Sequence, residues 1–301
     1  MNSLGKASAS SNGRKGSAFR KPSYKRSLAL LSTSGIVFGL GFSGSSPASA
    51  TTPAECIGNE ITPETTGTLA ARKLQNVLNI EEKLAVGDDD GIVCLNGDFA
   101  LSRPVDFHRH AQVYGIGARG ESSITSDSSV FSGLLNSTDW FDIYISNLSI
   151  VDSDGPAVQA GNVEVVDSIF SRNTSTVYQG GAIYSAGNVT ISSSEFSNNS
   201  ATTGGAIYAT GNVSISSGST LSENYASEDG GAINSLGGVT IQNSTLSGNE
   251  ALFLGGAILG VGPVTVSNNS TLSGNDAFGG GGAILGLSLI HISEPTRQAE
   301  I

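Results

Sequence analysis

Two histidines are the residues of this sequence whose type and spacing come nearest to a metal site. His108 and His110 flank Arg109, so an extended backbone would turn both imidazoles to one side, where their ring nitrogens could bind a metal ion. No third ligand stands near them in the sequence. We therefore expect neither a metal site nor a cofactor.

Two further features could bind a ligand. Asp88 to Asp90 stand between glycines and offer carboxylate oxygens, which Ca²⁺ prefers, but a solvated turn before a strand is the interpretation that we favour. Trp140 is the single tryptophan and could stack against a sugar ring, although an aromatic residue in a loop or edge strand is commoner. Neither feature points to a reaction.

The chain has two cysteines, Cys56 and Cys94. In an oxidising compartment they would form a disulfide that ties the N-terminal segment to the first predicted strand. A two-thiol metal site is the alternative, and it is disfavoured because no histidine or second cysteine pair stands at ligand spacing. We predict the disulfide.

The charge of the chain excludes some partners. Its formal net charge is −11, and residues 51–286 contain 24 acidic residues but only seven basic ones. This excess of negative charge argues against nucleic acid or an anionic membrane as a direct partner. It suits a soluble exported surface and leaves divalent cations as weak ligands.

Residues 1–50 have the three parts of a secretory signal peptide. The first 26 residues carry charge only as Lys or Arg, an apolar stretch follows over residues 27–42, and Ala48-Ser49-Ala50 resembles a cleavage site. A transmembrane anchor is the alternative, but the apolar stretch is shorter than about 20 residues and is diluted with Ser and Gly. We expect an exported protein that is cleaved near Ala50.

Residues 287–301 differ in character from the sequence before them. The string LSLIHISEPTR, from Leu287 to Arg297, resembles the translation of a transposase-type sequencing adapter. A genuine amphipathic terminus is the alternative. We expect residues 287–301 to be foreign, and the natural protein to continue beyond Gly286 with a C-terminal part that is missing here.

A repeat of 24 to 26 residues fills residues 155–286. Five copies begin at Gly155, Gly180, Gly204, Gly230 and Gly255, and a sixth opens at Gly281. A copy contains Gly-Gly-Ala-Ile, then an alternating Val-x-Ile or Val-x-Val, then Phe or Leu with Asn three residues later. The motif residues of the middle copies are Gly180, Gly181, Ala182, Ile183, Phe196, Asn199, Gly204, Gly205, Ala206, Ile207, Leu221, Asn224, Gly230, Gly231, Ala232, Ile233, Leu246, Asn249, Gly255, Gly256, Ala257, Ile258, Leu272 and Asn275.

This pattern predicts a solenoid. Alternation places the Val and Ile side chains on one face of a strand, and three such short strands per repeat leave no room for crossover helices. One repeat cannot bury its own apolar face, so successive coils must stack in parallel, with Ile, Val/Ile and Phe/Leu in three inward columns and Asn at a corner. A leucine-rich horseshoe and a calcium-binding β-roll of nonapeptides are the alternatives, and the motifs of both are absent.

The paired GGA[ILV] and FxxN signatures, once each per coil, resemble the repeats of the chlamydial-type polymorphic outer membrane proteins. The resemblance covers residues 155–286, although Leu replaces Phe in the last three copies and the first copy reads Gly-Pro-Ala-Val. It implies an all-β protein, a right-handed parallel β-helix similar to pectin-lyase-like solenoids. It also implies a passenger on the cell surface, often adhesive, that a C-terminal part anchors in the outer membrane, or in the cell wall of a Gram-positive relative.

Residues 51–154 resemble the N-terminal cap and first irregular coils of such a β-helix. The segment 66–84 has helical spacing of Leu69, Leu74, Val77 and Leu78 after a threonine cluster, and short strand-like pieces follow it. A solenoid needs a cap because an open end would expose unpaired backbone and apolar side chains. We expect a short capping helix and one continuous domain.

Catalysis would require groups that the repeats lack. The polysaccharide lyases and glycosidases of this fold use paired carboxylates, a calcium cage or a strong base. Residues 155–286 contain one basic residue, Arg172, and eight carboxylates that do not recur at fixed coil positions. We therefore predict an extracellular, non-catalytic surface passenger for adhesion or display, with an unknown protein or glycan ligand. A pectate-lyase-like enzyme whose catalytic coils are missing and a cell-wall spacer are the alternatives.

Overall fold

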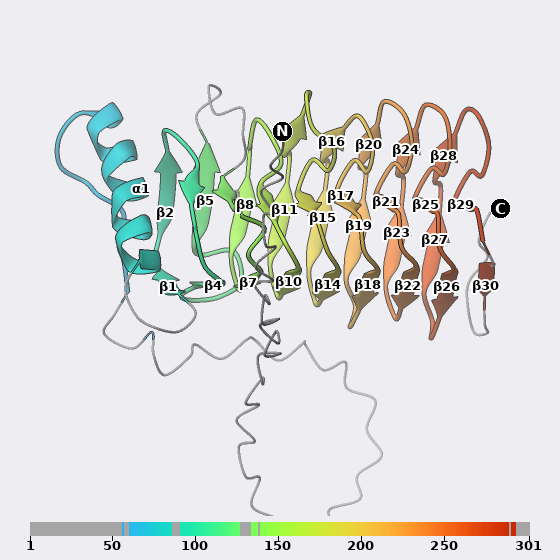
Figure 1. Cartoon of the computed structure of the whole chain (residues 1–301), viewed down its shortest axis with the longest axis horizontal. Coiled ribbons are helices and arrows are strands. Elements are labelled where there is room, and N and C mark those ends of the chain that lie inside the picture. The colour runs from blue at the N-terminus through green and yellow to red at the C-terminus, as the bar shows by residue number, and fades with distance from the viewer. Residues whose placement is uncertain are drawn as a thin grey trace, which may run out of the picture. The chain divides into compact units, whose positions relative to one another are not determined.

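The structure, a computed structural model, describes Cys56 and residues 60–85, 91–126, 134–137, 139–288 and 290–292. The predicted signal peptide, residues 1–50, and the acidic cluster Asp88 to Asp90 lie outside the described residues. The described residues form a parallel β-helix of about seven turns, with one helix at its N-terminal side, and the strands pair from coil to coil (Figure 1). The predicted fold class is confirmed.

Four sheets run along the axis. Sheet A comprises β1 (Gly91–Leu95), β4 (Ala111–Gly115), β7 (Ile143–Ser146), β10 (Val163–Val166), β14 (Val189–Ser192), β18 (Val213–Ser216), β22 (Val239–Gln242), β26 (Val264–Ser267) and β30 (Ile290–Ile292). Sheet B comprises β2 (Asp98–Leu101), β5 (Ser123–Ser126), β8 (Ser149–Val151), β11 (Ile169–Ser171), β15 (Glu195–Ser197), β19 (Thr220–Ser222), β23 (Thr245–Ser247) and β27 (Thr271–Ser273).

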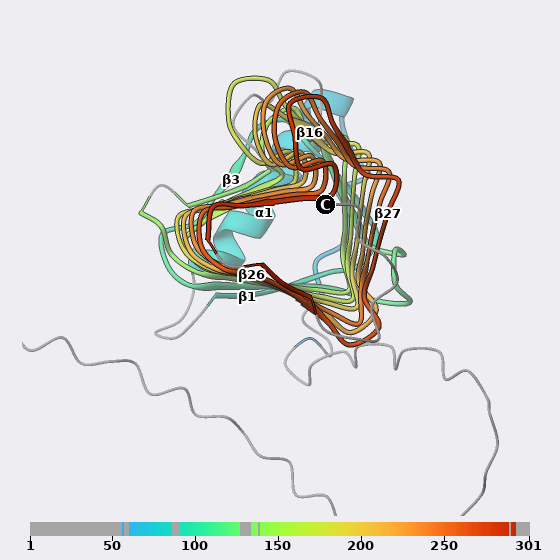
Figure 2. The ribbon, with the colours of Figure 1, turned by 90° about the vertical axis from the view of Figure 1, so that its right-hand side faces the viewer.

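The other two sheets complete each coil. Sheet C comprises β3 (Val105–Asp106), β6 (Leu135–Asn136), β9 (Val158–Ala160), β13 (Ile183–Ser185), β17 (Ile207–Ala209), β21 (Ile233–Ser235), β25 (Ile258–Gly260) and β29 (Ile284–Gly286). Sheet D comprises β12 (Thr174–Ser175), β16 (Ser200–Ala201), β20 (Tyr225–Ala226), β24 (Glu250–Ala251) and β28 (Asp276–Ala277). Viewed down the axis, the coils superpose into one repeated outline (Figure 2).

The prediction of three strands per coil is wrong for the repeats, which have four. The fourth strand belongs to sheet D and is two residues long, directly after the asparagine corner. In β20 and β24 the alanines Ala226 and Ala251 are buried, whereas Tyr225 and Glu250 lie on the outer side. Two residues are too few to display the alternation that identifies a strand in a sequence, so the pattern could not reveal this sheet.

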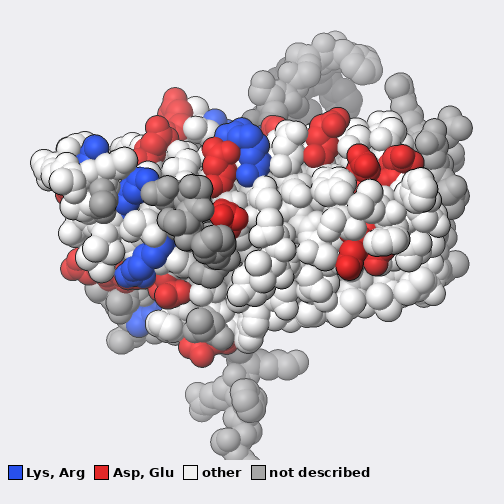
Figure 3. Space-filling view, turned by 90° about the horizontal axis from the view of Figure 1, so that it is seen from above, with Lys and Arg blue, Asp and Glu red and all other residues white. Residues whose placement is uncertain are grey.

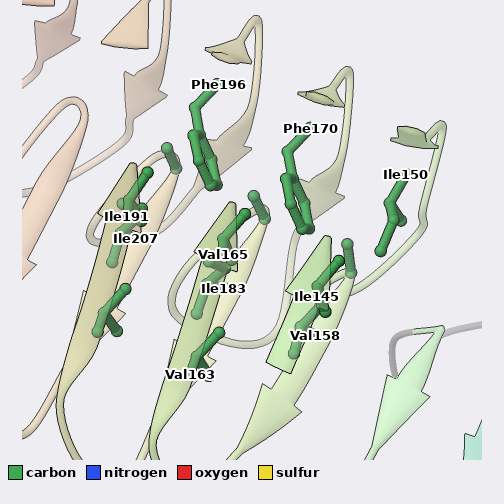
Figure 4. Close-up of a cluster of buried hydrophobic side chains, with 14 of the residues drawn as sticks. Ile145, Ile150, Val158, Val163, Val165, Phe170, Ile183, Ile191, Phe196 and Ile207 are labelled. Atoms are coloured by element: carbon green, nitrogen blue, oxygen red, sulfur yellow. The ribbon is translucent and has the colours of Figure 1, made fainter. Parts of the chain in front are cut away.

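The core is a single continuous stack of apolar side chains inside the coils. The three predicted columns are present: Ile183 pairs in register with Ile207, Val189 with Val213, and Phe196 with Leu221. Successive side chains of each column lie side by side from one coil to the next, as Ile150, Phe170 and Phe196 do (Figure 4). The rings of Phe170 and Phe196 stack with centroids 4.7 Å apart. Burying one such side chain contributes about 1.5–3 kcal/mol, so each coil stabilises its neighbours.

The two glycines of the Gly-Gly-Ala-Ile motif have different roles. The first, for example Gly204, has a φ of 62°, in the left-handed region that favours glycine. The second, Gly205, lies so close to the next coil that a Cβ atom there would overlap the carbonyl oxygen of Gly231. The same pair of constraints recurs at the equivalent positions of the neighbouring coils, so both glycines are required.

The corner asparagines form a buried ladder. Asn173, Asn199, Asn224, Asn249 and Asn275 are each at most 4% exposed. Along the ladder, each side-chain amide donates to the Oδ1 of the next asparagine at 2.8–3.0 Å, and each Oδ1 also accepts a backbone N–H from the coil before. The ladder therefore satisfies backbone groups that the turn would otherwise leave unpaired.

Helix α1 (Leu69–Ala85) covers the first coil and closes the core at that end (Figures 1 and 2). Thr68 caps the helix, because its hydroxyl accepts the backbone N–H of Ala71 at 3.3 Å. The predicted capping helix is confirmed, with bounds that differ by a few residues from the expected 66–84. Within the part of the chain that the structure describes, no helix has the length and apolarity to cross a membrane.

Of the apolar residues whose spacing predicted the helix, only Val77 packs on the core. Val77 is buried as expected, and Ile80 and Leu84 complete the inner face. Leu74 and Leu78 are 44% and 43% exposed. The helix carries apolar side chains on two faces, and only the position of the first coil decides which of them is buried.

The C-terminal segment continues the stack over its described residues. Strand β30 pairs in parallel with β26, with Ile290 opposite Val264 and Ile292 opposite Val266.

Candidate functional site

A disulfide joins Cys56 to Cys94 of β1, as the sequence predicted. Both cysteines are buried, and their Cα atoms are 5.6 Å apart. The bond fixes Cys56 to the first strand of sheet A. It has a structural role and contributes no group that could react with a ligand.

The two histidines lie against separate carboxylates. His108 Nδ1 is 3.3 Å from Asp139 Oδ2, and His110 Nδ1 is 3.6 Å from Asp142 Oδ2. The backbone N–H of Asp142 donates to His110 Nδ1 at 3.2 Å, so this nitrogen acts as an acceptor. Among the described residues, no group of three His, Cys, Asp or Glu side chains is placed to hold a metal ion.

A charged cavity of about 470 Å³ lies where α1 meets the first coil, next to these histidines. Its lining residues are Glu81, Leu84, Arg103, Asp106, Phe107, His108 and Arg109. Two hydrogen bonds of 2.6 Å join the Arg103 guanidinium to the Glu81 carboxylate, and this pairing raises the pKa of Arg103. Because acid and base bind each other here, the pair attaches the cap to the coil and is not free to transfer a proton.

The basic residue of the repeats is engaged in the same way. Arg172 Nε and Nη2 donate to the two carboxylate oxygens of Asp152 at 2.7 and 2.9 Å. On the face shown in Figure 3, basic side chains gather over the cap and the first coils, whereas the later coils carry acidic and uncharged ones. The one basic side chain of residues 155–286 is therefore held in an ion pair.

A second cavity, of about 460 Å³, has uncharged walls and lies on the outer side of sheet C. Its lining residues are Trp140, Gln159, Val177, Tyr178, Gln179, Tyr184 and Thr202. Gln159 and Tyr184 are partners in the register of β9 and β13, so they occupy the same outward position in successive coils. We call this site the aromatic cavity.

Aromatic rings form a short stack at the aromatic cavity. The centroids of Trp140 and Tyr184 are 5.7 Å apart, and those of Tyr184 and Tyr208 are 5.4 Å apart. The position after each Gly-Gly-Ala-Ile lies outside the core, but Tyr208 is only 9% exposed. Burial, followed by the proximity of Tyr184, raises the pKa of the Tyr208 phenol.

Trp140 is held in an unfavourable backbone conformation. Its φ is 59°, which costs a residue with a side chain about 1–2 kcal/mol. The neighbouring backbone is fixed by Phe141, whose N–H donates to Ser137 Oγ at 2.9 Å and whose carbonyl accepts the N–H of Gly161 at 2.9 Å. Glycine is required at 161 because a Cβ would overlap the Trp140 carbonyl oxygen. Despite this cost, 42% of Trp140 is exposed.

The aromatic cavity forms where one loop is longer than those of the following coils. Seven residues connect β12 to β13, five connect β16 to β17, and six connect the equivalent strands of each later coil. The longer loop, in yellow-green, extends beyond its successors (Figure 2). It supplies Val177, Tyr178 and Gln179 to the cavity, and Ser175 fixes it through two hydrogen bonds with the backbone of Tyr178, at 2.8 and 3.1 Å.

Of the cavity residues, sequence reasoning had singled out only Trp140. Two signals in the sequence mark some of the others, although neither shows that these residues meet. Tyr occupies the position after Gly-Gly-Ala-Ile in two consecutive copies, as Tyr184 and Tyr208, and the loop after Asn173 is the longest of the repeats.

Comparison with known proteins gives one match. Residues 167–186 and 193–210 match the family model of the Chlamydia polymorphic membrane protein repeat. These stretches contain two FxxN motifs and the Gly-Gly-Ala-Ile motifs that follow them, so the chain carries repeats of the kind that its sequence resembled. No curated protein and no solved structure matches the chain significantly.

Proposed function

We propose that this protein is a passenger displayed on the cell surface, where it functions in adhesion. The polymorphic membrane protein family is associated with the outer membrane and the cell surface, and two coils of this chain match its repeat. Residues 1–50 would direct export, and a buried disulfide suits the oxidising environment outside the cell.

One observation carries the proposal: the coils keep their inner positions constant and vary their outer ones. Within the repeats, the inward column of sheet C is Val158 followed by five isoleucines. The outward residues that follow it are Gln159, Tyr184, Tyr208, Asn234, Leu259 and Leu285. A constant interior supports the fold, while the other face of these strands changes from coil to coil. Tyr208, Asn234 and Leu259 are at most 9% exposed, so Gln159, Tyr184 and Leu285 are the members of this set that offer side chains to a ligand.

Two experiments test display and adhesion separately. Antibodies against the repeats should label intact cells of the source organism, and protease added outside those cells should remove the label. Beads coated with the full chain should bind to host cells or to other bacteria more than beads coated with Ile207→Asp, which places a charge in the core. Labelling only after cell lysis would overturn display, and equal binding by both kinds of bead would overturn adhesion.

Fewer observations support the two alternatives, a carbohydrate-active enzyme and a structural spacer. A carbohydrate-active enzyme would need a reactive acid and base, and in the cavity beside α1 the Glu81 carboxylate and the Arg103 guanidinium are engaged in an ion pair. Turnover of polygalacturonate by the full chain would overturn the non-catalytic assignment. A pure spacer would bind neither cells nor glycans.

A further inference from the structure

We propose that the aromatic cavity is a binding site for an uncharged glycan. Its biological meaning rests on the proposed adhesive function, for which the aromatic cavity would be the binding site and an uncharged glycan the ligand. Binding itself follows from the side chains of the cavity and can be measured without cells.

The lining of the aromatic cavity has the chemistry that sugars need. Trp140, Tyr178 and Tyr184 present aromatic surface, onto which the C–H face of a pyranose ring can pack. Gln159 and Gln179 each carry a carboxamide, which donates and accepts in one plane and so matches two neighbouring hydroxyl groups. The volume of about 460 Å³ falls within the range of small-ligand sites.

The charge of the site and of the chain selects against acidic ligands. All seven lining residues are uncharged, so a carboxylate or sulfate group would be desolvated there without a partner. The chain as a whole carries a net charge of −11, which repels anions at longer range. A neutral oligosaccharide incurs neither penalty.

The cavity is preorganised for binding. The strained backbone at Trp140 is fixed by hydrogen bonds and by the close approach of Gly161, and the loop that carries Tyr178 is fixed by Ser175. Trp140 keeps 42% of its surface exposed, so its ring is open to a ligand. Rigid aromatic residues lose little conformational freedom on binding.

A proline-rich peptide is the other ligand that aromatic grooves accept. A neutral glycan accounts better for this cavity, because two of its seven lining residues are carboxamides suited to diols and a third, Thr202, adds a hydroxyl. The experiment below therefore includes a proline-rich peptide, so that its binding can be told apart from that of a glycan.

The single tryptophan makes the site directly observable, because all tryptophan emission of the full chain comes from Trp140. The full chain is applied to a printed array of neutral and acidic glycans. Its emission is then titrated with lactose, cellobiose, diacetylchitobiose and digalacturonate, and with a proline-rich peptide. We expect array binding confined to neutral glycans, and a saturable emission change with at least one of the three neutral disaccharides.

Matched variants assign the signal to the aromatic cavity. Gln159→Leu and Tyr178→Ala keep the reporter and should weaken binding about tenfold or more, the loss typical of a central contact. Phe278→Ala removes an aromatic side chain that is 93% exposed and lies outside the cavity, and it should bind as the unmodified chain does. Circular dichroism confirms that each variant is folded.

Three results would overturn the proposal: no neutral glycan binds, only the peptide saturates the emission, or Gln159→Leu and Tyr178→Ala bind as tightly as Phe278→Ala. If coated beads still adhere to cells in any of these cases, the adhesive function stands and its ligand binds elsewhere. If adhesion also fails, the proposed function fails with it.

Discussion

Replacing one asparagine in the middle of the buried ladder should destabilise the solenoid far more than replacing an exposed one. Asn224 Oδ1 accepts from the backbone N–H and from the side-chain amide of Asn199, both at 3.0 Å. Its own amide donates to Asn249 Oδ1 at 2.9 Å and to the carbonyl of Phe196 at 3.0 Å. The substitution Asn224→Ala removes all four hydrogen bonds at a residue that is 1% exposed.

The magnitude follows from the groups left without partners. Two donors of Asn199, which is fully buried, lose their acceptor, and water cannot reach them. An unsatisfied buried donor costs about 1–3 kcal/mol, so Asn224→Ala should lower the free energy of unfolding by about 2–6 kcal/mol. Unfolding should begin in the coils around position 224, since each coil contacts mainly its neighbours.

The chain contains a matched control. Asn188 belongs to a second ladder, in which its Oδ1 accepts the backbone N–H of Asn212 at 2.8 Å, but Asn188 is exposed. Water replaces the lost acceptor in Asn188→Ala, so its cost should be about 1 kcal/mol or less.

Urea unfolding followed by circular dichroism measures both variants, and hydrogen exchange of the Asn199 amide reports the local effect. Equal midpoints for the buried and exposed variants, or an Asn199 amide that stays fully protected in Asn224→Ala, would refute the reasoning.

Three more predictions concern glycine packing, the disulfide and a buried phenol. Gly205→Ala should lower the melting temperature by several degrees because its Cβ would overlap the next coil, whereas Gly218→Ala, with open space around it, should lower it less; calorimetry compares them. Reducing the Cys56–Cys94 disulfide should cost about 2–4 kcal/mol and speed hydrogen exchange in α1 and β1 before the repeats, a result that uniform exchange would contradict. Burial raises the Tyr208 pKa, so the folded chain holds the phenol proton more tightly than the unfolded chain does. The contribution of this group to the free energy of unfolding is fully present below a pH of about 10 and is lost as the pH rises through the raised pKa. Tyr208→Phe should abolish this component of alkaline destabilisation, as melting curves against pH would measure.

Much of the fold could be read from the sequence because a solenoid repeats its requirements. Each copy must supply an apolar residue to every column, a glycine pair at one corner and an asparagine at another, so the period and the columns are visible in one chain. The disulfide was predictable for a different reason: the chain has only two cysteines, and both lie in the segment expected to be exported.

The sequence did not reveal features that depend on contacts between coils or on very short segments. The strands of sheet D are two residues long, so no alternation marks them. The exposure of Leu74 and Leu78 depends on how α1 lies on the first coil. The burial of Tyr208 also depends on its neighbours, since its place in the repeat is the same as that of the more exposed Tyr184.

By itself the sequence determined the stacking, because period-two alternation and a 25-residue repeat leave parallel coils as the arrangement that buries every apolar face. Only the tertiary structure decided the aromatic cavity. Trp140 precedes the repeats, yet its ring lies 5.7 Å from that of Tyr184, because stacking brings residues one or two coils apart to the same outer face. A cavity built from three coils and one longer loop has no local signature, since its residues become neighbours only when the coils stack.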